Sequence, residues 1–233
     1  MVILLNDIME EIVVHGHIAS QPSRSVILFC ELSKLKYRLQ EVNLPAGEMS
    51  RKSFKPLNPH REIPVVVCQG YNLWESGAII QYLADKFNVD NQYYPKNAEI
   101  RGRILAYLHW HHENVRRPIY TFIKKKVLFP IMLGKPEITL EKENKLREKI
   151  FGVCRDLEWV LEETGFVART QQVTIADIFA FNEIVSGHYV GIQISGFSRL
   201  SKWFETIAKI PEVKKVCDSV LNEFRLVNGS PKL

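Results

Sequence analysis

The sequence predicts a small α/β domain at residues 11–90, followed by an all-α domain at residues 96–233. Before about residue 90, short β-branched runs alternate with apolar-periodic stretches. After Asn88 the β signals mostly stop, and apolar residues recur at helical spacing. The length of 233 residues accommodates one large domain or two smaller ones, and the change of pattern favours two.

The first domain is expected to run strand, helix, strand, a variable segment, then a hairpin of two strands and a closing helix. Pro22 suits the start of the first helix, since its missing N–H would have no partner there. The turn Cys68-Gln69-Gly70 between two β runs favours the hairpin. The expected ranges are 11–16, 22–32, 37–42, 64–67, 71–73 and 75–87.

The second domain is expected to hold roughly five helices. Apolar residues recur at helical spacing from Ile100 to Ile119, and Pro118 predicts a kink there. Thr174-Ile-Ala-Asp177 matches a capping box, in which Thr174 accepts from the N–H of Asp177 and the carboxylate bonds back. The remaining helices are expected at 141–163, from 175 onward, at 201–210 and at 211–224.

Composition is that of an ordinary soluble globular protein, with 46% hydrophobic and 24% charged residues and a net charge of +5. The dense basic run Lys124-Lys125-Lys126 is interpreted as a solvated helix face in preference to a nucleic-acid patch. Four widely spaced cysteines argue against a disulfide framework, a zinc ribbon and a two-cysteine redox site. The opening five residues are too short for a signal segment, and no apolar run approaches the ~20 residues of a membrane helix. We therefore expect a cytoplasmic protein that binds neither membrane nor nucleic acid.

Ile63-Pro64 stands directly before the third expected strand, where a proline is tolerated because it opens the hydrogen-bond ladder. If this bond is cis, the peptide groups around Ile63 turn outward and are left unpaired by the sheet. An extended peptide could then dock there by strand-like hydrogen bonds. The alternative is an ordinary trans proline at a strand start.

Two serines stand where helices begin. Glu75-Ser76 opens a helix directly after a strand, and its free N–H groups and positive dipole end make that start a carboxylate site. Ser20 precedes the first helix, where a hydroxyl can donate to a thiolate. For each serine the alternative is simple capping of its helix.

Together these patterns resemble the glutathione transferases: a serine after the first strand, Ile-Pro about forty residues on, and Glu-Ser-x-Ala-Ile about ten later. Ser-Gln-Pro-Ser-Arg at 20–24 is similar to the theta class, which uses serine where others use tyrosine or cysteine. The resemblance implies a thioredoxin-like, glutathione-binding domain at 11–90 and an all-α helical-bundle domain at 96–233 that carries the electrophile pocket. It covers about residues 12–225 and includes Asn58-Pro59, Trp74-Glu75-Ser76, Tyr94-Pro95, Trp110-His111-His112, Arg116-Arg117, Phe129-Pro130, Leu133-Gly134 and Val173–Asp177.

The resemblance also implies roles for single residues. Ser20 would donate its hydroxyl to the glutathione sulfur, and Arg116 would face the thiol pocket. Glu113 falls where the class often has an acidic residue that reaches the partner subunit's ligand. The backbone of Ile63 would pair with the cysteinyl unit, and the Glu-Ser pair would hold the γ-glutamyl end. The residues expected to bind glutathione are Gln21, Ser50, Glu62, Ile63, Pro64, Glu75 and Ser76.

Some positions depart from the theta pattern. Glu62 stands where that class usually has lysine, and Met49 and Ser50 stand where it often has basic or polar residues for the glycine carboxylate. Glu62 would repel the negative ends of glutathione unless a basic neighbour compensates. The candidates for that compensation are Arg61, Arg51 and His60.

Other candidate residues have simpler interpretations. His109 and His112 share one helix face and His111 lies on another, so packing and hydrogen bonding are preferred over a metal site. Ser23 is the rival to Ser20 as the activating hydroxyl and is expected to point elsewhere. Core packing is the default for four aromatic residues that otherwise would line the electrophile pocket, namely Tyr107, Trp110, Phe122 and Trp203.

The expected function is that of a homodimeric, theta-like glutathione S-transferase that uses glutathione as co-substrate and needs no metal or other cofactor. The resemblance implies small electrophiles: alkyl or aralkyl halides, epoxides or organic hydroperoxides. The alternative is a non-catalytic protein of the same fold with a structural or partner-binding role, which Glu62 and Met49 keep open. A thiol-disulfide oxidoreductase is disfavoured, because serine stands where such proteins need cysteine.

Overall fold

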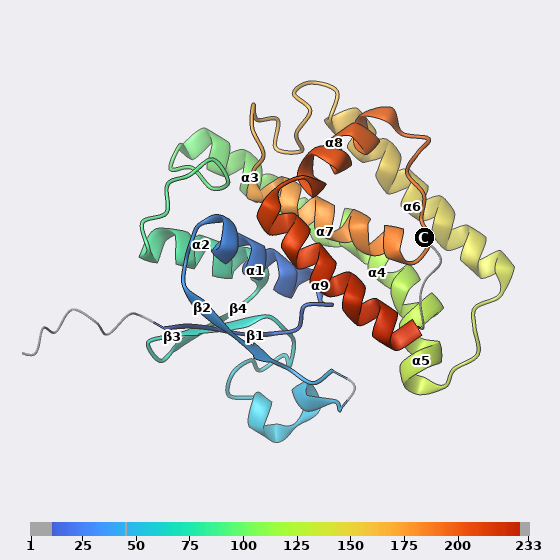
Figure 1. Cartoon of the computed structure of the whole chain (residues 1–233), viewed down its shortest axis with the longest axis horizontal. Coiled ribbons are helices and arrows are strands. Elements are labelled where there is room, and N and C mark those ends of the chain that lie inside the picture. The colour runs from blue at the N-terminus through green and yellow to red at the C-terminus, as the bar shows by residue number, and fades with distance from the viewer. Residues whose placement is uncertain (1–10, 45, 229–233) are drawn as a thin grey trace, which may run out of the picture. The chain divides into compact units, whose positions relative to one another are not determined.

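The computed structural model describes residues 11–44 and 46–228. The opening five residues, interpreted above as too short for a signal segment, lie outside the described residues. The chain divides into two compact units, residues 1–88 and 89–233. The first unit is built around a sheet and the second from helices (Figure 1).

A four-stranded sheet in the order β2-β1-β3-β4 forms the centre of the first unit. β1 (Ile12–Gly16) pairs in parallel with β2 (Tyr37–Glu41) and antiparallel with β3 (Val65–Cys68). β3 pairs antiparallel with β4 (Tyr71–Trp74) through a tight hairpin. Gln69 and Gly70 have φ values of 52° and 79°, the two left-handed residues that such a turn requires. The predicted hairpin is therefore confirmed.

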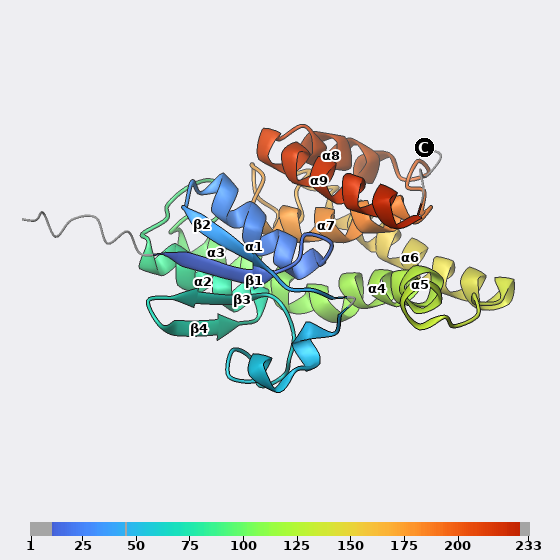
Figure 2. The same cartoon turned by 60° about the horizontal axis from the view of Figure 1, so that its bottom comes forward.

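Two helices pack side by side and against strands of this sheet, α1 (Gln21–Leu32) and α2 (Ser76–Lys86) (Figure 2). α1 connects the parallel strands β1 and β2, a crossover that a parallel pair needs. Almost every residue of α1 is buried, which explains its continuous apolar run. The variable segment before β3 contains two short 3₁₀ turns, η1 (Glu48–Ser50) and η2 (Lys52–Phe54). Each predicted strand and helix of this unit is confirmed within one residue of its expected bounds.

The described part of the second unit holds seven α-helices where roughly five were expected. The difference arises because two π-helical turns, η3 (His112–Arg116) and η4 (Lys124–Leu128), divide the first helical stretch. The α-helices are α3 (Ala98–His111), α4 (Arg117–Ile123), α5 (Phe129–Leu133), α6 (Leu140–Val160), α7 (Ile175–Tyr189), α8 (Ser198–Ala208) and α9 (Pro211–Asn228). No described helix is long and apolar enough to cross a membrane.

Each π-helical turn ends two residues before a proline, Pro118 or Pro130. A proline inside a helix has no N–H to donate, and its ring clashes with the carbonyl four residues earlier. These carbonyls belong to Asn114 and Lys126, and both lie inside the π turns, where the wider winding makes room. The irregularity expected at Pro118 therefore takes the form of a π-helical turn that precedes it.

α7 is the central helix of the second unit, buried from Ile175 to Gly187 and in contact with α3, α4 and α8. The capping box predicted at its start is present, and the N–H of Thr174 donates to Asp177 at 2.9 Å. Asp177 also accepts from the backbone N–H of Val167 at 3.0 Å and from the indole N–H of Trp203 at 2.9 Å. Burial raises the pKa of Asp177, although these hydrogen bonds act against that rise. Trp203 therefore packs in the core, its default interpretation.

Candidate functional site

The strand register brings three of the predicted segments to one end of the sheet. β1 runs directly into the loop that holds Ser20. His15, near the end of β1, pairs with Val65 at the start of β3, and Val65 pairs with Trp74 at the end of β4. Neighbouring strands lie ~4.8 Å apart. The serine loop, the Ile-Pro pair before β3 and the Glu-Ser pair after β4 therefore lie at the same end of the strands (Figure 2).

Ser20 occupies the N-cap position of α1, with extended backbone angles of φ −80° and ψ 118°. Within the described residues, its hydroxyl makes no hydrogen bond to the N–H groups of the first helical turn. The side chain is half-buried, and Pro22 lies in the first turn. The alternative for this serine is that its hydroxyl simply caps α1, and the structure shows no such cap bond among the residues it describes. The hydroxyl and the positive end of α1 together form an anion-attracting position.

Ser23, the rival hydroxyl, faces the sheet. It is fully buried, and a Cβ placed on Gly16 would come within 2.9 Å of its Oγ. In the described part of the chain this Oγ has no hydrogen-bond partner. The close approach of α1 to β1 therefore requires glycine at position 16, and it turns the Ser23 hydroxyl toward the strand.

The Ile63–Pro64 peptide bond is cis and not trans. Ile63 is half-buried and packs against a buried cluster of Val42, Phe54 and Val65. Met49 packs against the same cluster. Met49, which departs from the theta pattern, thus has a packing role, since its side chain contributes to this apolar cluster.

Asn58 shapes the loop that leads to this cis bond. Its side-chain amide donates to the carbonyl of Glu62, and its side-chain oxygen accepts from the N–H of His60, both at 2.9 Å. The Asn58 side chain is buried, whereas Glu62 is exposed. The carboxylate of Glu62 therefore remains at the surface of the loop as a negative charge.

Of the basic neighbours, Arg61 bonds to a second predicted segment. It has a left-handed backbone (φ 58°), and its guanidinium donates to the carbonyl of Ser50 at 3.2 Å. His60 packs edge-on against Trp74, with ring centroids 4.8 Å apart. Arg61 thus ties the Ile-Pro loop to the 3₁₀ turn that contains Ser50, and places a cation beside the exposed Glu62.

Glu75 joins β4 to α2 with a strained backbone. Its φ of 70° and ψ of 111° lie outside the regions that non-glycine residues ordinarily adopt. Such strain persists only where the surrounding structure fixes it, and it clusters at binding sites. Ser76 is the first residue of α2 and is buried, whereas Glu75 is exposed. Gln21, the first residue of α1, is also buried.

Arg116 lies in the second unit, in the first π-helical turn. Its guanidinium donates to the buried carboxylate of Glu183 at 3.2 Å and lies over the ring of Tyr120, 5.3 Å from the centroid. Its side chain is 23% exposed, so the guanidinium is anchored without being fully enclosed. Glu113, in the same turn, pairs with Arg117 one helical turn on.

The three histidines do not gather at one point. His111 is buried, with Nδ1 3.3 Å from the Tyr107 hydroxyl and Nε2 3.8 Å from Glu183. His109 is exposed and His112 half-buried. Among the described residues, no three His, Cys, Asp or Glu side chains are arranged to hold a metal ion. His111 thus belongs to a buried polar network with Tyr107 and Glu183.

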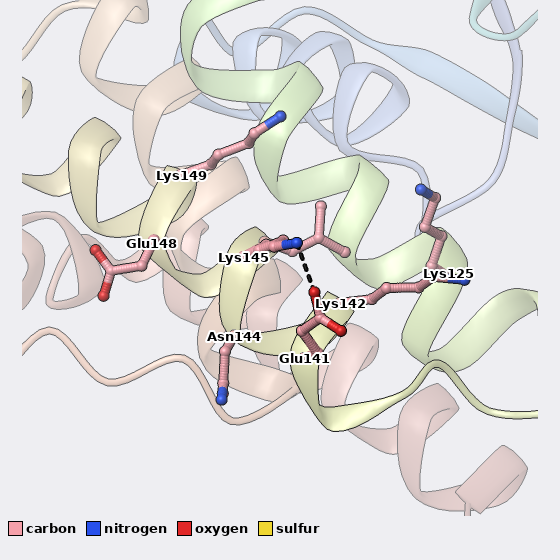
Figure 3. Close-up of a pocket in the computed structure, with 8 residues that line it drawn as sticks. Lys125, Glu141, Lys142, Asn144, Lys145, Glu148 and Lys149 are labelled. Carbon is pink, nitrogen blue, oxygen red and sulfur yellow. Dashed lines mark hydrogen bonds and ion pairs between the residues drawn. The ribbon is translucent and has the colours of Figure 1, made fainter.

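The middle lysine of the run lies at a groove of about 580 Å³ on the second unit (Figure 3). Lys125 lines this groove together with lysines of α6, of which Lys145 pairs with Glu141 at 2.6 Å. Lys126 instead pairs with Glu143 at 2.9 Å, and Lys124 lies over the Phe129 ring at 5.2 Å. The three lysines of the run thus have three different environments. None of the residues predicted to bind glutathione lines the groove.

Two charged residues received no role from the sequence alone. Arg24 is buried at one turn after Ser20, and Glu183 is buried against Arg116. Glu183 stands in a largely apolar run, which is the available signal for it, since a buried charge needs partners. Arg24 stands between two serines and carries no such signal. The identity of those partners requires the tertiary structure.

Comparison with known proteins agrees with this arrangement. Residues 14–85 match the family model "Glutathione S-transferase, N-terminal domain". Glutathione S-transferase theta-2 of Rattus norvegicus is 30% identical over 81% of this chain and 77% of its own length. Glutathione S-transferase theta-1 of Mus musculus is 29% identical over 81% of this chain and 78% of its own length.

Solved structures show the same architecture. A human theta-class glutathione transferase in complex with the glutathione conjugate of 1-menaphthyl sulfate superposes with a TM-score of 0.84. It is 26% identical, with 93% of this chain and 90% of that chain covered. The predicted fold class, a thioredoxin-like α/β part followed by an all-α part, is confirmed. The chain therefore belongs to the glutathione S-transferase family, in which its relatives are theta-class members.

Proposed function

We propose that this protein is a theta-type glutathione transferase that binds glutathione in a domain at residues 11–90 and an electrophile in a domain at residues 96–233. The observation that carries the proposal is the convergence of three segments at one end of the strands of the sheet. One segment presents the Ser20 hydroxyl, which makes no cap bond within the described residues. The start of a helix suits a carboxylate, and a backbone that can form strand-like hydrogen bonds suits an extended peptide. With the Ser20 hydroxyl, the three segments suit a ligand that has a carboxylate, a peptide backbone and a thiol.

In this proposal glutathione binds across the three segments in one orientation. Its γ-glutamyl carboxylate would bind the start of α2 through Ser76 and the neighbouring N–H groups, with Glu75 on the amino group. Its cysteinyl unit would pair with the backbone of Ile63 beside Pro64, which directs the thiol toward Ser20. Gln21, Ser50 and the loop of Glu62 would complete the site. The strained backbone of Glu75 supports a binding contact at the start of α2.

Ser20 would activate the thiol by donating its hydroxyl to the sulfur, which stabilises the thiolate. A free thiol has a pKa of ~8.5 and must lose about two to three units to ionise at neutral pH, or about 3–4 kcal/mol. One charge-assisted hydrogen bond, the dipole of α1 and a guanidinium, for which we propose Arg116, suffice for this. No metal or further cofactor is needed, because glutathione itself supplies the nucleophile.

The transfer step is a displacement at an electrophilic centre. The thiolate sulfur forms a bond to carbon, and the leaving group departs with the electron pair of the bond that breaks. Halides are a suitable class, and so are epoxides, in which the C–O bond opens and the oxygen stays on the product as a hydroxyl. An organic hydroperoxide would instead be attacked at oxygen, and two glutathione molecules would reduce it to an alcohol and water while forming glutathione disulfide. The solved human relative holds a conjugate of a menaphthyl sulfate, so sulfate esters are a further class to assay. We propose a cytoplasmic homodimer as the working form.

The proposal is tested by calorimetric titration of the wild-type protein with glutathione, together with an ultraviolet difference spectrum at neutral pH. Binding accompanied by thiolate absorbance supports a transferase. The absence of binding at millimolar glutathione would overturn it and favour a structural or partner-binding role.

A pair of serine variants then tests the activating group. Ser20→Ala is expected to keep glutathione affinity within a few-fold and to lower kcat about 100-fold or more. Ser23→Ala is the matched control, one turn away, with a hydroxyl turned toward Gly16. It is expected to retain full turnover, since its removed hydroxyl has no partner in the described structure. Equal effects of the two substitutions would contradict the role of Ser20.

A further inference from the structure

Arg24 is a buried charged residue in the first turn of α1. It is 1% exposed and is the largest side chain among the described residues that are fully buried. It lies on α1 between the buried Ser23 and Ser25, four residues after Ser20. A guanidinium is costly to bury unless acceptors surround it, so its position requires an explanation in terms of what it binds.

Three hydrogen bonds of Arg24 converge on the loop between β1 and α1. Its Nη1 donates to the carbonyl of Ile18 at 3.1 Å and to that of Ala19 at 3.2 Å. Its backbone N–H donates to the carbonyl of Ser20 at 2.9 Å. Arg24 therefore donates to three consecutive carbonyls. The last of them belongs to Ser20, the residue proposed to activate the thiol.

The rest of the loop is held by local contacts to His17. The N–H of Ser20 donates to the carbonyl of His17 at 3.0 Å, and the N–H of Ala19 to the His17 ring at 3.2 Å. The Ser20 side chain itself is not fixed by a cap bond to any described residue. The direction of its hydroxyl is therefore set by the backbone at 18–20, and two of the carbonyls there are held by the Arg24 side chain.

We infer that Arg24 is a positioning residue for Ser20: its buried guanidinium fixes the 18–20 backbone so that the hydroxyl faces the thiol site. The inference rests on the proposed function of Ser20. The planar, multi-donor guanidinium suits two neighbouring carbonyls, whereas an ammonium on a shorter, flexible stem does not reproduce that geometry. Lysine at this position keeps the charge and loses the fixed backbone.

Arg24→Lys is the decisive variant, with Arg38→Lys as the matched control. Arg38 lies in the same unit, but its side chain is 52% exposed and pairs with Glu11 at 2.8 Å. Arg24→Lys is expected to lower kcat on the order of 10- to 100-fold, with the KM for glutathione within about threefold, because displacement by ~1 Å weakens catalysis more than binding. Amide hydrogen exchange at 18–20 is expected to accelerate about tenfold or more, while Arg38→Lys changes neither quantity.

Chemical rescue separates positioning from a general loss of structure. In Arg24→Ala, added methylguanidinium is expected to restore part of kcat, whereas methylammonium is not. Wild-type kcat together with wild-type exchange at 18–20 in Arg24→Lys would overturn the inference while the transferase function stands. If the wild-type protein does not bind glutathione, the proposed function fails. In that case amide exchange at 18–20 in Arg24→Lys still tests the anchoring by Arg24. An exchange rate equal to that of the wild type overturns the anchoring, and a faster rate supports it.

Discussion

Glu158, on α6, accepts a hydrogen bond of 2.8 Å from the backbone N–H of Leu200, in the first turn of α8. The same carboxylate accepts from the N–H of Arg199 at 3.0 Å and from the hydroxyl of Ser198 at 3.3 Å. Phe197, at the N-cap of α8, has no side-chain acceptor. A residue about forty positions earlier therefore caps α8 and ties it to α6.

This cap makes stability depend on pH. Burial acts to raise the pKa of Glu158, but the hydrogen bonds from Leu200, Arg199 and Ser198 lower it below the ordinary glutamate value. A lowered pKa in the folded state means that the contribution is present above the unfolded value of ~4.3 and is lost as the pH falls through the folded value. Glu158→Ala is expected to lower the free energy of unfolding by about 1–2 kcal/mol at pH 7.

Urea unfolding at pH 7, 5 and 3 checks this expectation. The difference between wild type and Glu158→Ala should shrink at pH 3. Glu162→Ala is the control, since its carboxylate pairs with Arg199 at 2.9 Å but is 58% exposed. It should cost at most ~0.5 kcal/mol. A difference for Glu158→Ala that stayed constant from pH 7 to pH 3 would refute the charged cap.

The ion pair between Arg116 and Glu183 is asymmetric, since Glu183 is 2% exposed and Arg116 is 23% exposed. Arg116→Met would leave a buried carboxylate with a weaker set of partners. We expect a loss of about 3 kcal/mol in the free energy of unfolding, because breaking a buried pair costs more than replacing both members. The double variant Arg116→Met/Glu183→Gln should recover part of that loss.

Arg117→Met is the control for Arg116, since Arg117 pairs with Glu113 and both side chains are largely exposed. Its expected effect is below ~0.5 kcal/mol. Chemical denaturation of the three variants measures the comparison. A single and a double variant of equal stability would mean that Glu183 does not depend on Arg116.

Glu62→Lys tests the departure from the theta pattern. Glutathione is anionic at neutral pH, and the substitution changes the local charge by two units on an exposed loop. At about 7 Å in water, each unit is worth about 0.6 kcal/mol, so the Kd for glutathione should fall about fivefold or more. The effect should weaken as salt is raised.

Glu11→Lys is the matched control for Glu62→Lys. Glu11 precedes β1 at the end of the strand opposite to Ser20, and it is exposed. Calorimetry at low and high salt should show no gain in glutathione affinity for this variant. Equal affinities of Glu62→Lys and wild type would show that the Glu62 charge does not reach the ligand.

The cysteines are expected to differ in reactivity. Burial, with Glu31 nearby for Cys30, raises the pKa values of Cys30 and Cys154 to about 12, so their thiolate fraction at pH 8 is on the order of 10⁻⁴. Cys217 is half-buried. Titration of the native protein with an aromatic disulfide reagent should therefore modify Cys217 first. Cys217→Ser should remove that first phase, and its persistence would place the reactive thiol elsewhere.

The sequence by itself determined the order of strands and helices in the first unit, the hairpin at Gln69-Gly70 and the capping box of Thr174 and Asp177. Each of these depends on residues within a few positions of one another, where periodicity, turn chemistry and capping act directly. The Ser20 region and the Glu75-Ser76 helix start were recognisable for the same reason. The short range of these interactions makes them readable along the chain.

Only the tertiary structure decided how those residues are used. Ser20 and Ser23 both suit a helix start, but the close approach of α1 to Gly16 turns one hydroxyl toward the strand. The carbonyls bound by Arg24, the register that aligns the three segments and the cap from Glu158 all depend on packing between elements. Packing partners far apart in the chain leave no periodic signal, because their contact energy appears only when the chain has folded.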